Sequence, residues 1–184
     1  MKLASLLAYG ALTAVVAFGA AGQSDLPMVG GAAMYPNKDI VQNAMNSKDH
    51  TTLVAAVKAA GLVDTLESPG PFTVFAPTNQ AFEKLPAGTV DTLLKPENID
   101  QLKKVLTYHV VPGRINAAKL AAMIKKGGGQ ATLTTVEGGT LTAMMDGNNV
   151  VLKDAKGDTA TVTQTNVMQK NGVIHVIDTV LLPN

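Results

Sequence analysis

The sequence contains no cysteine, and this absence excludes several kinds of protein at once. None of its 184 residues can form a disulfide framework, act as a thiolate nucleophile or carry the lipid of a lipid-attached export signal. Stability must therefore come from a packed core. A domain of about 150 residues can bury about two-thirds of the surface of its unfolded chain, which is enough for such a core.

An excess of charge of one sign is also missing. The chain has 15 Lys and Arg against 14 Asp and Glu, and loss of residues 1–21 would remove only Lys2 from this balance. Nucleic acids and anionic membranes attract proteins with a net positive charge or a block of basic residues. The neutral composition therefore gives no reason to expect nucleic acid or an anionic membrane as a partner.

Long apolar runs are confined to the N-terminus. Met1 and Lys2 precede an uncharged, largely apolar run at residues 3–18, and three small residues follow at 19–21. This layout is typical of a secretory signal peptide, and we expect cleavage after Ala21. A membrane anchor is the alternative, but the run is shorter than the ~20 residues of a usual spanning helix.

The expected organisation is a signal peptide at residues 1–21, a linker or tail at residues 22–36 and one domain at residues 37–184. The linker is rich in Gly, Ala and Met and shows no helical or strand period. No later run has the length of a membrane span, so we expect none after signal cleavage. We expect a secreted or periplasmic protein, and a chain without disulfides fits a bacterial protein better than a eukaryotic one.

Helical and strand patterns are segregated along the chain. Apolar residues at helical spacing dominate residues 37–126, and two strands are predicted there, at residues 72–75 and 108–111. From residue 131 onward, five short β-type runs are separated by turn pairs, namely Gly138-Gly139, Asp146-Gly147, Lys156-Gly157 and Asn171-Gly172. This segregation indicates an α+β fold.

The last strand, predicted at residues 171–183, is the most apolar one. Both of its faces are mainly aliphatic, which is typical of a central strand that is covered on both sides. His175 and Asp178 interrupt these faces. Because an unpaired buried polar group costs about 1–3 kcal/mol, we expect both side chains to find hydrogen-bond partners inside the protein.

Aromatic residues are few, and most of the phenylalanines gather around one predicted strand. Phe72, Phe75 and Phe82 are three of the four phenylalanines. Each can bury about 150–250 Å², so this strand and the helix after it are expected at the centre of the core. Thr78 and Asn79 stand at the corner between them, where their side chains can bond to the backbone.

Three segments together resemble the fasciclin domain, a module of cell-surface and secreted adhesion proteins. They are residues 73–82, the pair at 108–109 and residues 171–183, and the resemblance spans residues 37–184. It implies a compact β-sheet wedge with helices concentrated in the N-terminal half. It also implies structural roles for the family-signature positions Thr73, Phe75, Pro77, Thr78, Asn79, Phe82, Asn171, Gly172, His175 and Asp178.

The resemblance further implies a candidate binding motif at Tyr108, His109, Val110 and Val111. A Tyr-His pair with flanking aliphatic residues is implicated in integrin binding in animal matrix members of the family. A second integrin-linked motif contains an aspartate, which the matching residues 166–168 lack, so integrin recognition is not supported. We expect His109 to lie in the interior and Tyr108 to be partly exposed.

Patterns that would indicate an enzyme or a metal site are weak. His50, His109 and His175 include no closely spaced pair, whereas a zinc site needs three or four convergent ligands. After residue 21 the only serines are at 24, 47 and 68, and none lies in a Gly-x-Ser-x-Gly setting. We therefore expect no catalysis, no metal and no other cofactor.

These observations favour an exported, non-catalytic binding module for cell adhesion or for surface and matrix association. We expect a monomer whose partner is an unknown protein, carbohydrate or lipid at the cell surface. One alternative is a periplasmic protein that binds a small ligand or lipid between its sheet and helices. Another is envelope copper buffering, because methionine thioethers are soft ligands for copper(I), and the candidates are Met28, Met34 and Met45.

Overall fold

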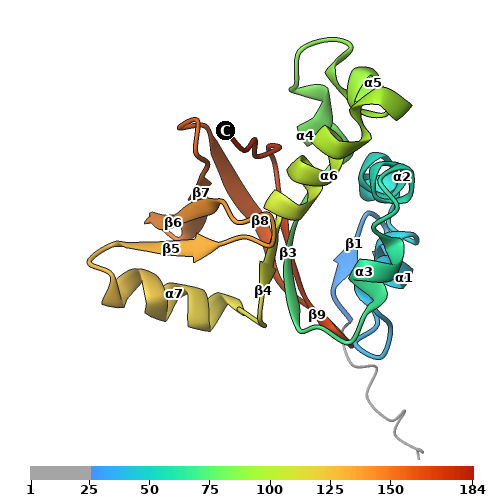
Figure 1. Ribbon diagram of the computed structural model, residues 1–184. Coiled ribbons are helices and arrows are strands. Elements are labelled where there is room, and N and C mark those ends of the chain that lie inside the picture. Colours follow the sequence, from blue (N-terminus) through green and yellow to red (C-terminus); the bar gives the residue numbers. More distant parts are fainter. Residues whose placement is uncertain (1–25) are drawn as a thin grey trace, which may run out of the picture.

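The computed structural model describes residues 26–184, so the predicted signal peptide lies outside the described residues. The helices are α1 (Ile40–Ala44), η1 (Lys48–His50), α2 (Thr51–Ala59), α3 (Val63–Glu67), α4 (Asn79–Glu83), α5 (Thr89–Leu93), η2 (Pro96–Asn98), α6 (Ile99–Tyr108) and α7 (Ala117–Lys126). The strands are β1 (Met28–Val29), β2 (Ala32–Ala33), β3 (Phe72–Pro77), β4 (Val110–Pro112), β5 (Gln130–Thr134), β6 (Thr140–Asp146), β7 (Asn149–Lys153), β8 (Thr159–Gln169) and β9 (Gly172–Ile177). Helices precede the run of hairpin strands, as the α+β prediction required (Figure 1).

One mixed sheet connects the two halves of the chain. Its strand order is β4-β3-β9-β8-β7-β6-β5, in which β3 and β9 run parallel and the other neighbours are antiparallel. The predicted central position of the last strand is confirmed, because β9 lies between β3 and β8. The strand ends at Ile177, earlier than predicted. Its partner there is Pro77, which ends β3 and has no N–H to continue the ladder.

The sheet separates two hydrophobic cores. Val74 and Ala76 of β3 face the first core, which the N-terminal helices cover, whereas Phe75 faces the second, between the arms of the bent sheet and α7 (Figure 1). Side chains alternate along a strand, so the phenylalanine cluster is divided. Phe75 is fully buried in the second core, while Phe82 lies in the first core and Phe72 packs against it.

The linker or tail predicted at residues 22–36 packs on the domain over its described part. Residues 26–36 contain the β1–β2 hairpin, and they contribute Val29 and Met34 to the first core. Gly30 lets the hairpin approach η1 closely, since a Cβ there would lie 2.6 Å from the Asp49 nitrogen. The absence of a repeating pattern in so short a hairpin explains why the sequence did not reveal it.

The predicted strand at residues 108–111 begins two residues later than expected. Tyr108 is the last residue of α6, His109 caps the helix with helical dihedral angles, and β4 starts at Val110. The apolar stripe of Leu102, Val105 and Leu106 continues the helix this far. An apolar run of four residues does not by itself distinguish a helix end from a strand.

Candidate functional site

His109 joins the end of α6 to the C-terminal segment. Its Nδ1 donates to the Val105 carbonyl at 2.8 Å, and its Nε2 accepts the Leu181 N–H at 3.0 Å. These partners require the neutral Nδ1–H tautomer, because only one ring nitrogen can donate here. Burial lowers the pKa of His109 to about 4, although the Val105 carbonyl and Asp154 act in the opposite direction. The ring lies in the interior, as expected from the sequence.

Tyr108 is completely buried, so the expectation of partial exposure was wrong. Its hydroxyl donates to the Thr140 carbonyl at 2.7 Å and accepts the Ala155 N–H at 3.0 Å. Burial raises the pKa of the Tyr108 phenol. Tyr108 is the last residue of α6, and its side chain lies in the second core. Its hydroxyl therefore links α6 to β6 and to the turn between β7 and β8. Val110 and Val111 are buried as well, so the predicted motif presents no open binding surface.

His175 lies on β9 and is also fully buried. Its ring stacks on Phe75 with centroids 5.6 Å apart, and its Nε2 donates to the Ile115 carbonyl at 2.8 Å. Its Nδ1 has no hydrogen-bond partner among the described residues. Burial lowers the pKa of His175, which keeps the ring neutral. Thr73 bonds to the same loop between β4 and α7 that contains Ile115. Its hydroxyl donates to the Gly113 carbonyl and accepts the Ile115 N–H.

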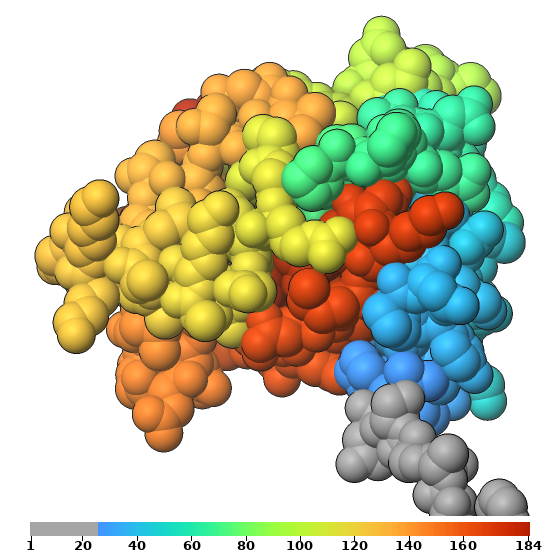
Figure 2. Space-filling model, turned by 90° about the horizontal axis from the view of Figure 1, so that it is seen from below, coloured from blue at the N-terminus to red at the C-terminus, as the bar shows by residue number. Residues whose placement is uncertain are grey.

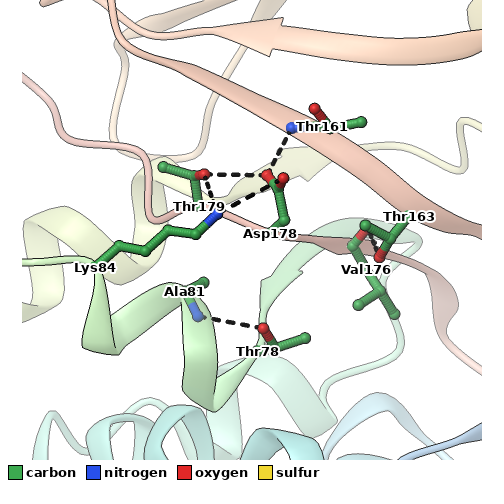
Figure 3. Close-up of polar contacts among 8 residues, drawn as sticks. All are labelled: Thr78, Ala81, Lys84, Thr161, Thr163, Val176, Asp178 and Thr179. Carbon is green, nitrogen blue, oxygen red and sulfur yellow. Dashed lines mark hydrogen bonds and ion pairs between the residues drawn. The ribbon is translucent and has the colours of Figure 1, made fainter.

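Thr78 and Asn79 organise the corner after β3. The Thr78 hydroxyl accepts the Ala81 N–H at 3.2 Å and caps α4 (Figure 3). The Asn79 side chain accepts the Thr52 N–H at 3.0 Å and donates to the Lys48 carbonyl at 2.8 Å. The Asn79 side chain therefore bonds to the start of α2 and to η1. The sequence predicted only bonds to the nearby backbone at this corner.

Asn171 and Gly172 anchor the start of β9 to the helical layer. The Asn171 amide accepts the Ile40 N–H at 3.1 Å and donates to the carbonyls of Leu66 and Ser68. Gly172 is required by close approach, because a Cβ there would lie 2.1 Å from the Phe72 carbonyl oxygen. The pair therefore acts as a clamp between strand and helices as well as a turn.

Asp178 has hydrogen-bond partners within the protein, as the sequence predicted. Its carboxylate accepts the Thr161 N–H at 2.8 Å and the Thr179 hydroxyl at 3.0 Å (Figure 3). Lys84 from the end of α4 approaches the same carboxylate at 3.7 Å. Asp178 thus links β8 and the chain beyond β9 to α4.

One serine and one histidine lie close together, but their surroundings do not suit catalysis. Ser47 Oγ is 2.9 Å from His50 Nδ1, and burial lowers the pKa of His50. Both side chains are buried, and the other ring nitrogen of His50 faces the Ala76 carbonyl. Gly30 lies close to Ser47, and the side chains around the pair are mainly apolar, whereas a serine nucleophile needs hydrogen-bond donors for an oxyanion.

Metal ligands are not gathered in the part of the chain that the structure describes. Residues 26–184 contain no group of three or more His, Asp or Glu side chains placed to hold an ion. Met34 is buried in the first core, whereas Met28 and Met45 are more than half exposed. Burial of Met34 leaves at most two accessible thioethers of the three that the copper hypothesis invoked.

A narrow apolar groove runs between the N-terminal helices and the sheet. Its cavity volume is about 50 Å³, which is room for a few water molecules. Side chains from α1, α2 and α3 form one wall, and β3 with the end of α6 forms the other. His109 and Val110 contribute to the lining, so the groove is where the predicted binding motif comes nearest to a cavity. The exposed Val136 stands at its edge.

A family model named Fasciclin domain matches residues 48–183. The chain belongs to the fasciclin domain family. Its relatives include Protein sll1483 of Synechocystis sp., with 50% identity over 85% of this chain and 79% of that protein. They also include the cell surface glycolipoprotein MPB83 of Mycobacterium bovis, with 31% identity over 89% of this chain and 63% of that protein.

A solved structure supports the same fold assignment. It contains a FAS1 domain pair from the insect cell adhesion molecule fasciclin I, with a TM-score of 0.55 and 25% identity. The match covers 71% of this chain and 43% of that one. The α+β wedge that the sequence implied is therefore the observed fold of this fasciclin domain.

One residue that organises this fasciclin domain was missed from the sequence. Asp154 accepts the N–H groups of Lys156 and Asp158 with one oxygen, and the Leu182 N–H at 3.0 Å with the other. The local turn is visible in the sequence, since Asp and Gly favour such turns. The bond to Leu182 is not, because it depends on where the C-terminal segment packs.

Proposed function

We propose that this fasciclin domain is an exported, non-catalytic module that acts by binding at the cell surface or in the surrounding matrix. Two relatives support the proposal by name, one as a cell surface glycolipoprotein and one as a cell adhesion molecule. The apolar N-terminal run supports export to the cell exterior or periplasm. We propose that the exported chain is a monomer.

The observation that carries the proposal is the burial of the three histidine side chains. His50, His109 and His175 are all buried, and one ring nitrogen of each faces a backbone carbonyl. Active sites instead expose such groups in a cleft with a poised pKa. Because these groups lie in the interior, we propose that the outer surface is the functional part of the molecule.

The test compares cells that lack the gene with cells that produce the protein. Producing cells should hold the chain in the envelope or medium, and they should attach better to a surface or to one another. Purified protein added to the deficient cells should restore attachment. The proposal would be refuted by a cytoplasmic location, or by unchanged attachment together with no detectable association of the purified protein with cells.

A second candidate is a periplasmic carrier of an apolar ligand, and the groove favours it. Its lining is mainly apolar, which suits a hydrocarbon ligand better than a polar one. Protein taken from its own envelope should then carry a co-purifying lipid in native mass spectrometry. Ala44→Phe should fill the groove and abolish the added mass, whereas Ala121→Phe, on exposed α7, should retain it.

A further inference from the structure

The balanced net charge conceals a separation of charge along the chain. Residues 101–136 contain Lys103, Lys104, Arg114, Lys119, Lys125 and Lys126 and no acidic residue. Residues 64–100 have the opposite balance, with six acidic residues against two lysines. A chain that is neutral in total can therefore present a basic surface to a partner.

The helix α7 turns several of these cations outward. Leu120 and Ile124 are buried against the sheet in the second core. The opposite side of the helix is exposed and carries Ala118, Lys119, Ala121, Ala122, Lys125 and Lys126. This outer side has no acidic side chain and no bulky apolar one, so its character is set by the three ammonium groups.

Hydrogen bonds hold Arg114, which lies just before α7, close to the chain at Lys170 and Lys38. The Arg114 Nη2 donates to the carbonyls of Gln169 and Lys170, at 3.2 and 3.0 Å. The Lys170 N–H in turn donates to the Lys38 carbonyl at 2.8 Å. We name the basic face by its six residues, Lys38, Arg114, Lys119, Lys125, Lys126 and Lys170. Figure 2 shows its elements together, with α7 in yellow, the β8–β9 end in orange-red and the segment before α1 in blue.

The cations of the basic face are not neutralised within the described residues. The ion pairs among the described residues are Lys84 with Asp178 and Lys104 with Glu137, and neither pair includes a residue of the basic face. Asp39, beside Lys38, uses its carboxylate to cap α1 through the Gln42 N–H. Like charges repel one another across such a surface, and an anionic partner would relieve that repulsion.

We propose that the basic face binds a linear polyanionic polysaccharide, which would be the surface partner of the proposed binding module. Lys119 and the Lys125-Lys126 pair lie about 10 Å apart along α7, so one extended polyanion can contact both ends of the helix. Membrane binding by an amphipathic helix needs bulky apolar residues beside the cations. The outer side of α7 offers alanines instead, which favours a solvated polymer over a bilayer.

The test measures binding of the purified protein to alginate, a linear polyuronate, with uncharged dextran as the comparison polymer. Binding should weaken as salt is raised, because salt screens exposed charges. The variant Lys119→Glu/Lys125→Glu/Lys126→Glu should bind alginate at least about tenfold more weakly, a difference of about 1.4 kcal/mol. The control Lys48→Glu/Lys95→Glu/Lys103→Glu changes net charge equally at exposed sites outside the basic face and should change affinity less than about twofold.

The proposal is overturned if wild-type protein does not bind alginate, or if both triple variants lose affinity equally. It is also overturned if vesicles of phosphatidylglycerol or duplex DNA bind through the face and alginate does not. Attachment of both variants to deficient cells separates this inference from the proposed function. If the α7 variant still associates with cells as wild type does, the polysaccharide inference fails and the surface function stands; if wild type does not associate, the function itself fails.

Discussion

His109 provides a quantitative test of how the interior is held together. We consider His109→Gln, whose amide nitrogen and oxygen both lie at the end of the side chain and cannot both occupy the positions of Nδ1 and Nε2, which bond to Val105 and Leu181. One buried backbone group is then left unpaired, which should cost about 1–3 kcal/mol at pH 7.5. The effect should appear in the free energy of unfolding, because both bonded groups lie in the interior.

The same substitution should change how stability depends on pH. The pKa of His109 is about 4 in the folded protein and is expected near the ordinary value of 6.5 when unfolded. Its contribution is fully present above pH ~6.5 and is lost as pH falls through the folded pKa. Between pH 7.5 and 5 the loss from this group is about 2 kcal/mol. His50 and His175 add losses in the same direction, since burial lowers both of their pKa values.

Urea unfolding at pH 7.5 and pH 5 measures both effects. With a urea slope of about 1–3 kcal/mol per molar, the His109 contribution corresponds to a midpoint change of about 1 M. The Gln variant should start lower at pH 7.5 and should lose about 2 kcal/mol less on acidification than wild type. Equal midpoints for both proteins at both pH values, or parallel losses on acidification, would refute the assigned bonding of His109.

Three further predictions follow from packing and export. Phe75→Ala should lower the free energy of unfolding by about 3–5 kcal/mol, because Phe75 is fully buried against His175; a thermal midpoint within a degree or two of wild type would contradict its placement. Gly172→Ala should prevent normal folding, since the new methyl group would meet the Phe72 carbonyl at 2.1 Å, and a native circular dichroism spectrum with an unchanged midpoint would disprove that contact. The exported protein should lack residues 1–21, and an intact mass that retains them would disprove cleavage near Ala21.

Much of the fold could be predicted from local sequence patterns. The turn pairs between residues 138 and 172 gave the five final strands, and the two apolar faces of residues 173–177 gave the central position of β9. Both features depend on neighbouring residues only. The parallel pairing of β3 with β9 was not predictable in the same way, because it joins segments that are about one hundred residues apart.

The candidate site was harder to predict because its contacts are distant in sequence. Tyr108 bonds to β6 and to Ala155, which local patterns could not indicate. The basic face was also hidden, since the composition is neutral and Lys38, Arg114 and Lys170 come together only in the folded chain. Charge totals describe the whole molecule, whereas recognition depends on one face of it.

The most direct test of the surface-binding function is an equilibrium binding isotherm on intact cells. Purified protein, labelled at its N-terminal amine, would be titrated onto cells that lack the gene, with heat-unfolded protein as the control. The proposed function predicts saturable binding that unlabelled folded protein displaces and that the unfolded control does not show. Linear, non-displaceable uptake equal to that of the unfolded control would contradict it.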